Sequence, residues 1–288
     1  MKNFAVMLIL CAAALYGQPV TGISGALEWD KMEINAVVSL DLASAGIRLP
    51  SGRTRGEALI ESEYVRLIRP EILDLPVDSS STIADLVERG EYSLAEAENF
   101  VLGARSLVPV LSPDLLSLRA SYSISLTRLV STLLRHSRPA EGMRTLSPVP
   151  VPAYTGIIII ASGALPVHGR KGSAAVQPCL FPKIWDTGMN LVYERNMLDP
   201  SGDSMIRYAP LDDVFGSGLS AGAAALVGDR PLRILARGVF GERPTDPVID
   251  REDALLIISS GENRRLLREG RVLIALDDAA LKVPLGRD

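Results

Sequence analysis

Residues 138–152 read RPAEGMRTLSPVPVP, and residues 154–161, just beyond them, read YTGIIIIA. Alternating prolines favour an extended backbone without internal hydrogen bonds, which is typical of a connector between folded parts. The aliphatic run after Gly156 is short, β-branched and followed by a second glycine at 163, which is typical of a fully buried strand. Together the two stretches predict that a second folded domain begins near residue 153.

The chain therefore divides into an N-terminal domain over residues 18–136, a Pro-rich linker over 137–152 and a C-terminal domain over 153–288. A length of 288 residues suits two domains of ordinary size. Hydrophobic residues make up 47% and charged residues 22%, which argues against wholesale disorder. We expect an α/β fold of the α+β type, with sheet and helices mixed within each small domain.

In the N-terminal domain, alternating apolar and polar residues predict a strand or hairpin over 26–42 and a strand over 116–126. Capping boxes at Thr54–Glu57 and Ser93–Glu96 indicate helix starts, because the hydroxyl and the carboxylate each bond a free backbone N–H. Pro70 is expected to stop the first helix. The predicted helices cover about residues 54–69, 82–89 and 93–104.

In the C-terminal domain, aliphatic runs predict most of the strands. Pro178 and Pro182 would place one of them at a sheet edge, because proline cannot donate to a strand ladder. Asp250, Glu252 and Asp253 open a helix that runs to Ser259, and stabilisation at the helix start explains them better than acid–base catalysis. The predicted strands cover residues 154–161, 176–185, 190–194, 231–240 and 271–276, and a second short helix covers 262–269.

The first 17 residues resemble a secretory signal peptide. Met1-Lys2 gives a positive start, an apolar run extends from Phe4 to Leu15, and small residues follow at Gly17 and Gly22. The run is too short to span a bilayer. A buried N-terminal strand is the alternative interpretation. We expect export to the periplasm, with cleavage near Gly17 or retention of the leader as an anchor.

The cysteines and the charge limit the partners. Cys11 follows Leu8-Ile9-Leu10 rather than a small residue, so it does not fit a lipid-attachment site. Cys179 would be the one cysteine left after cleavage of the leader. It could be free or pair between chains, and we expect it to be buried and inert. The net charge is −4 and long blocks of like charge are absent from the sequence, which argues against nucleic acid as a partner.

Three groups of residues in the C-terminal half resemble a known family. They are Tyr154-Thr155-Gly156 before the aliphatic run, a Pro182-x-Ile-x-Asp hairpin that closes on Val192-Tyr193, and the helix–strand unit over 250–276. The segment from Tyr154 to Leu276 is thereby similar to the FlgP-like envelope lipoproteins, which are associated with flagellar assembly at the outer membrane. The resemblance implies a scaffold role without catalytic residues. The chain departs from the pattern in lacking a lipid-attachment box and in its Gly- and Ala-rich sequence between 193 and 230.

One stretch matches a catalytic motif. Residues 218–222 read GLSAG and fit Gly-x-Ser-x-Gly, in which a strained turn after a strand exposes the serine. The residues before Ser220 make a poor strand, and His136 and His168 both precede a serine that the histidine should follow. A small-residue loop is therefore favoured over a nucleophile. Two histidines and one cysteine also make a typical zinc ligand set unattainable without several carboxylates.

Two groups of basic residues are candidate partner-binding sites. Arg170 and Lys171 lie between glycines, without the spacing of a phosphate-binding loop, and predict an exposed turn where an acidic partner or anionic headgroup could dock. The set Arg264, Arg265 and Arg268 gives the last helix a basic edge, which is either a solvated face or a docking surface.

The sequence thus predicts a non-enzymatic exported envelope protein that works as a periplasmic scaffold or assembly factor. We assign no catalytic, cofactor-binding or metal-binding residues. The expected partners are envelope or flagellar proteins, with peripheral membrane association and oligomerisation as further options. The alternatives are a serine hydrolase using Ser220 and a binding module for the cell wall or anionic ligands using Arg170 and Lys171.

Overall fold

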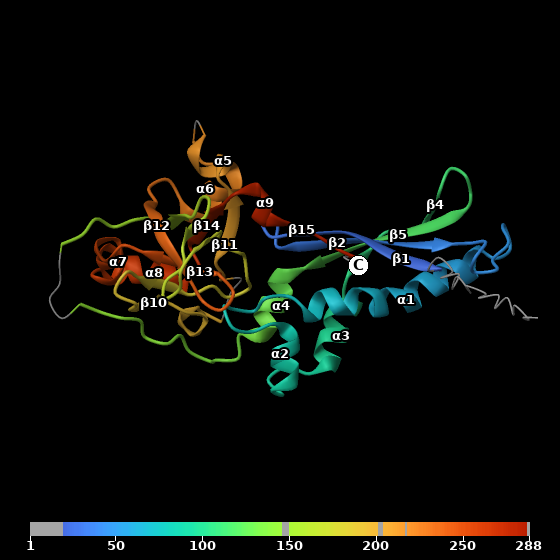
Figure 1. Cartoon of the computed structure of the whole chain (residues 1–288), viewed down its shortest axis with the longest axis horizontal. Helices are drawn as coiled ribbons and strands as arrows, with labels where there is room; N and C mark the ends of the chain where they lie inside the picture. The colour runs from blue at the N-terminus through green and yellow to red at the C-terminus, as the bar shows by residue number, and fades with distance from the viewer. Residues whose placement is uncertain (1–19, 146–149, 201–203, 217, 287–288) are drawn as a thin grey trace, which may run out of the picture.

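A computed structural model describes residues 20–145, 150–200, 204–216 and 218–286 (Figure 1). It shows two domains of mixed sheet and helices arranged end to end, which confirms the predicted α+β class. The predicted signal peptide and residues 146–149 of the predicted linker lie outside the described residues. No helix in the described ranges is long and apolar enough to cross a membrane.

The N-terminal domain is built on an antiparallel sheet. The predicted hairpin is confirmed as β1 (Thr21–Glu28) and β2 (Glu33–Asp41), and the predicted strand over 116–126 as β5 (Ser117–Ser125). Alternate residues of β2 are fully buried, which is the pattern that predicted it. The sheet order is β15-β1-β2-β5-β3, with β4 also on β5; the short strands are β3 (Arg105–Ser106), β4 (Val110–Leu111) and β15 (Lys282–Pro284).

One long helix, α1 (Arg53–Leu73), packs against this sheet. The predicted capping box at Thr54–Glu57 is wrong, because the helix begins a residue earlier, after Gly52, and no side chain caps it. The predicted stop at Pro70 is also wrong. Pro70 lies in the last turn of the helix, where it removes one backbone N–H without ending the helix. The helix continues because its buried face extends to Ile72; that face is formed by Gly56, Ile60, Tyr64, Ile68 and Ile72.

Three shorter helices complete the first domain. The capping box predicted at the start of α3 (Leu94–Leu102) is confirmed, and α2 (Ile83–Glu88) opens with another, from Thr82 to Asp85. In both, the hydroxyl accepts from the backbone N–H three residues on. The helix α4 (Leu126–Leu133) was not predicted. Its buried residues recur with helical spacing directly after the alternating pattern of β5, so the change of period marks the boundary; they are Leu126, Leu129, Val130 and Leu133.

The second domain has a seven-stranded mixed sheet in the order β10-β9-β13-β12-β6-β14-β11. Four predicted strands are confirmed as β6 (Ile157–Ile160), β10 (Leu191–Tyr193), β12 (Leu232–Phe240) and β14 (Val272–Leu276). The two predicted helices are α7 (Arg251–Ile258) and α8 (Gly261–Arg268). Every residue of β6 and β14 is buried, as expected of strands inside a parallel arrangement.

The strand predicted over 176–185 is mostly wrong. Only β9 (Ile184–Asp186) is a strand, and the residues before it form a buried irregular segment that bonds to other loops. Pro178 and Pro182 cannot donate to a ladder, which explains the irregular path. The Gly- and Ala-rich region between 193 and 230 is part of the domain, because β11 (Arg207–Pro210) pairs with β14; it also holds η1 (Arg195–Met197), α5 (Asp212–Phe215) and α6 (Ala221–Val227).

The remaining elements connect or flank the second sheet. The strand β13 (Asp246–Ile249) pairs with β12 and β9, and β7 (Leu165–Pro166) pairs with β8 (Ser173–Ala174). The helix α9 (Asp278–Leu281) leads the chain back to the first domain, where β15 adds to the edge of β1. The chain therefore passes between the domains twice, and one hydrophobic core runs through both.

Candidate functional site

The two domains meet at a loop of the first domain, residues 76–81, which we call the seam loop. Leu180 N–H donates to the Pro76 carbonyl at 2.9 Å and Phe181 N–H to the Val77 carbonyl at 2.8 Å. From the other side, Arg243 N–H donates to the Ser79 carbonyl at 2.9 Å. The irregular segment before β9 therefore has the seam loop as its hydrogen-bond partner, which compensates for its lack of a strand ladder.

A buried carboxylate lies at this seam. Asp246 accepts from the Lys183 N–H at 3.1 Å, the Trp185 indole N–H at 3.3 Å and the Thr245 hydroxyl at 3.0 Å. Burial raises the pKa of Asp246, and hydrogen bonds, including one from the Ser79 side chain, oppose that rise. With its lone pairs engaged by fixed donors, Asp246 is a structural centre of the seam.

The seam is packed so closely that Gly241 cannot be replaced by a residue with a side chain without a clash. Gly241 has a φ of +115°, and a Cβ at this position would lie 2.3 Å from the Ser79 Cβ and 2.5 Å from the Arg243 carbonyl oxygen. A glycine is required there both for the backbone conformation and for the close approach of the two domains.

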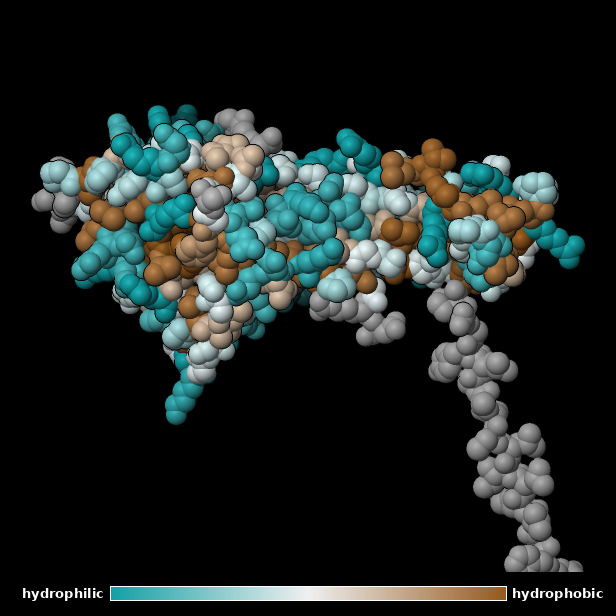
Figure 2. Space-filling model, turned by 90° about the horizontal axis from the view of Figure 1, so that it is seen from above, coloured by the Kyte–Doolittle hydropathy of each residue, from teal (hydrophilic) through white to brown (hydrophobic). Residues whose placement is uncertain are grey.

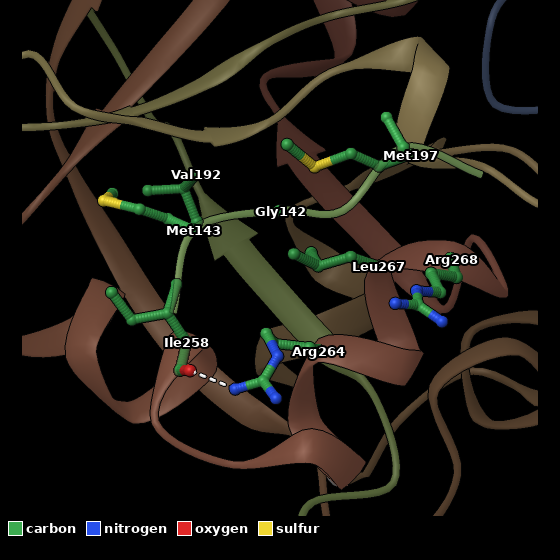
Figure 3. Close-up of a pocket in the computed structure, with 9 residues that line it drawn as sticks. Gly142, Met143, Val192, Met197, Ile258, Arg264, Leu267 and Arg268 are labelled. Atoms are coloured by element: carbon green, nitrogen blue, oxygen red, sulfur yellow. Dashed lines mark hydrogen bonds between the residues drawn. The ribbon is translucent and has the colours of Figure 1, made fainter. Parts of the chain in front are cut away.

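Part of the predicted linker lies against the second domain. We call residues 138–145 the strap. Ala140 N–H donates to the Asn196 carbonyl at 2.7 Å, and Figure 3 shows Gly142 and Met143 running across Met197 and Val192. The cavity left beneath the strap is about 10 Å³, which is about the room of one water molecule. The chain itself therefore fills this pocket.

The three arginines of α8 have separate partners. Arg264 donates to the Ile258 carbonyl at the end of α7 (Figure 3). Arg268 pairs with Glu141 of the strap at 2.9 Å. Arg265 pairs along its own helix with Glu269 at 3.2 Å and is largely exposed. Two of the three predicted docking residues thus hold the strap and the α7–α8 junction, and Arg265 is the most exposed of the three although it is paired with Glu269.

The other predicted basic site is an exposed turn. Arg170 and Lys171 lie between β7 and β8, flanked by Gly169 and Gly172 with positive φ angles. In the part of the chain that the structure describes, neither side chain forms an ion pair, and no hydrogen bond or ion pair joins the turn to α8. The two predicted basic groups are therefore separate surfaces.

The candidate nucleophile Ser220 and the two histidines have separate partners. Ser220 is the N-cap of α6 and accepts from the Ala223 N–H at 3.3 Å. His136 bonds the Leu198 carbonyl at 2.8 Å, and His168 packs edge-on against Phe240. Among the described residues no hydrogen bond joins Ser220 to either histidine, so the GLSAG stretch forms a helix cap in this structure.

Cys179 is buried, as predicted. Its N–H donates to the Tyr208 hydroxyl at 3.0 Å, and that hydroxyl donates back to the Cys179 carbonyl at 2.9 Å. Burial raises the pKa of the Cys179 thiol, which suppresses the reactive thiolate. No group of three or more His, Cys, Asp or Glu residues that could hold a metal ion occurs within the described ranges.

A cluster of exposed hydrophobic residues that was not predicted from the sequence lies at the far end of the first domain. Five aliphatic side chains from the stretch between β3 and β5 are each 57–78% exposed. Figure 2 shows hydrophobic residues gathered at this end, away from the second domain. We call this surface the apolar tip; it consists of Leu107, Val108, Val110, Leu115 and Leu116. The signal was the pair Leu115-Leu116 next to a turn, where polar residues are expected.

Comparison with known families covers both domains. Residues 20–132 match the family model of the Treponema pallidum Tp0624 N-terminal domain, and residues 156–278 match that of the Tp0624 second domain. The resemblance of the C-terminal half to FlgP-like lipoproteins is therefore wrong, because a different family matches that half and the likeness extends to the N-terminal half. No curated protein matches the chain closely enough to count as a relative. The chain is thus similar to Tp0624 over its N-terminal and second domains, in the same order and across most of its length.

Proposed function

We propose that the chain is a non-enzymatic protein of the periplasm that works as a rigid scaffold, holding two binding surfaces at a fixed separation. The observation that carries the proposal is the double connection between the domains. The seam loop bonds three backbone groups of the second domain, and β15 returns from the second domain to pair with β1. Two connections of this kind oppose hinge motion, which is the default for domains joined by one linker.

The surfaces at the two ends support the same function. The apolar tip lies at the far end of the first domain, while the exposed turn at Arg170 and Lys171 and the exposed Arg265 belong to the second domain. A scaffold needs chemically different surfaces at different places, so that two partners bind at once. The leader predicted from residues 1–17 would deliver the protein to the envelope.

The test uses photo-cross-linking in the protein's own cells. A photoreactive residue is placed at Val110 in one variant and at Arg170 in another, and a third carries it at Glu61 on the exposed face of α1 as a matched control. Cells are fractionated and the cross-linked partners identified by mass spectrometry. We expect recovery in the periplasmic or membrane fraction, with cross-linked products from Val110, protein or lipid, that differ from those from Arg170, and few from Glu61.

Recovery in the cytoplasm with residues 1–17 intact would contradict the proposed location. A single shared partner from all three positions would contradict a scaffold with two separate surfaces.

A second candidate function is a binding module for anionic envelope polymers. It is favoured by the exposure of Arg170 and Lys171, whose charges form no ion pair within the described part of the chain. The double substitution Arg170→Ala/Lys171→Ala should then weaken binding to purified anionic cell-wall polymers, whereas Arg265→Ala should not. Equal binding by the double variant and the unchanged protein would exclude this role.

A further inference from the structure

The apolar tip is built so that its polar atoms are satisfied internally. The Asp114 carboxylate accepts from the Ser112 hydroxyl and from the Leu116 N–H at 3.0 Å, and the Ser117 N–H donates to the Ser112 hydroxyl at 2.9 Å. Leu115 takes a positive φ of 61°, which is uncommon for a residue other than glycine. This turn directs Leu115 and Leu116 to solvent, and exposed apolar clusters of this kind mark interaction sites.

Four arginines lie at the same end of the first domain as the tip, and one of them, Arg53, is paired with Glu57. Arg53 donates to the Pro109 carbonyl at 3.1 Å and so ties the start of α1 to the tip. Arg48 and Arg55, at the same end of the domain, are exposed and form no ion pair in the described part of the chain, and Arg119 is exposed on β5 opposite Val110. Exposed aliphatic side chains together with nearby guanidinium groups complement an anionic bilayer surface, which has an apolar interior and negatively charged headgroups.

The N-terminal segment enters the fold beside the tip. The Asp41 N–H donates to the Val20 carbonyl at 2.9 Å, and the next residue, Leu42, donates to the Leu116 carbonyl at 3.0 Å. Val20 and Leu116 are therefore joined through two consecutive residues at one end of the sheet. The apolar run from Phe4 to Leu15 precedes Val20 in the sequence, so the described chain begins at the end of the domain that carries the apolar tip.

We infer that the apolar tip is a membrane-contact site, at which its aliphatic side chains insert among the headgroups of an anionic bilayer while the nearby arginines bind the lipid phosphates. The inference goes beyond the proposed scaffold function, because it assigns the occupant of one surface. Side chains that protrude suit a soft lipid surface, whereas a folded protein partner would bury them in a matching pocket.

The test is sedimentation of the full chain with vesicles. The vesicles contain either phosphatidylglycerol with phosphatidylethanolamine or phosphatidylcholine alone. The tip variant is Val108→Glu/Leu116→Glu. The matched control is Phe215→Glu/Leu235→Glu, which makes the same changes at exposed apolar residues of the second domain. We expect the tip variant to bind anionic vesicles at least about tenfold more weakly than the unchanged chain, because two aliphatic groups no longer insert. The control should bind as the unchanged chain does.

A second measurement reads insertion directly. Leu115→Trp places a fluorophore at the tip, far from Trp29 at the seam end of the first domain and Trp185 in the second. Brominated lipids should quench the added tryptophan. Equal vesicle binding by the tip and control variants, or no quenching at position 115, would overturn the inference. The inference would also be overturned if the unchanged chain were a dimer, and if the tip substitutions converted it to a monomer without weakening lipid binding. Equal binding to both vesicle types would overturn the role of the arginines. None of these outcomes depends on cross-linking partners, so the scaffold proposal is tested separately.

Discussion

At the scale of single residues, Asp246 should make the stability of the protein depend on pH in a way opposite to most carboxylates. Burial raises the pKa of Asp246 in the folded state above its ordinary value of 3.8. The stability that Asp246 contributes through this shift is therefore fully present below pH 3.8. It is lost as the pH rises through the raised pKa of the folded state. Glu96 acts in the other direction, because hydrogen bonds from Ser93 lower its pKa.

The substitution Asp246→Asn isolates this effect. The free energy of unfolding of the unchanged protein and of the variant is measured in urea between pH 4 and pH 7. The unchanged protein should exceed the variant most at pH 4, and the difference should shrink as the pH rises. The control is Asp229→Asn, an exposed carboxylate. A difference between the unchanged protein and Asp246→Asn that is constant with pH would contradict the raised pKa.

Ser220 should behave as a helix cap. The change Ser220→Ala removes the hydroxyl that accepts from the Ala223 N–H and should lower the free energy of unfolding by about 1 kcal/mol. A fluorophosphonate probe should label neither the unchanged protein nor the variant. Labelling that disappears in Ser220→Ala would instead support the hydrolase alternative.

At the scale of elements, β15 should stabilise the first domain although it is at the far end of the sequence. Leu285 follows β15, is buried, and its N–H donates to the Gly25 carbonyl at 3.1 Å. Leu285→Ala should lower the free energy of unfolding by about 2 to 4 kcal/mol. In hydrogen exchange, the amides of β1 should lose protection. Leu235→Ala, at an exposed leucine, should change neither; a similar effect of both substitutions would contradict this account.

Local patterns predicted the elements whose cause is local. Alternation identified β2 and β5, and hydroxyl–carboxylate spacing identified the start of α3. Elements that depend on distant partners were missed or misread. The segment 176–183 is hydrophobic like a strand, yet its partner is the seam loop about 100 residues earlier. The strand β15 is only three residues long and depends on the edge of β1.

The same distinction applies to the candidate sites. The sequence correctly placed Arg170 and Lys171 in an exposed turn, because glycines on both sides require one. It could not show that Arg268 pairs with Glu141, since 127 residues separate the two. Nor could it show that Leu107 through Leu116 share one end of the sheet with Val20, because that depends on the pairing of β1, β2 and β5.

At the scale of the whole molecule, the two domains are joined as one body. The seam loop and β15 each join the two domains, and Figure 1 shows the domains joined end to end with α9 and β15 spanning the junction. A fixed separation between the apolar tip and the second domain follows, and a scaffold requires it.

Double electron–electron resonance tests this claim most directly. Spin labels at Glu61→Cys and Glu262→Cys, both exposed and in different domains, are attached in a Cys11→Ser background; Cys179 is buried. The account predicts one narrow distance distribution, which broadens in Gly241→Val because a larger side chain cannot fit against Ser79. A broad distribution in the protein without the Gly241 substitution would show that the domains move independently and would contradict the rigid scaffold.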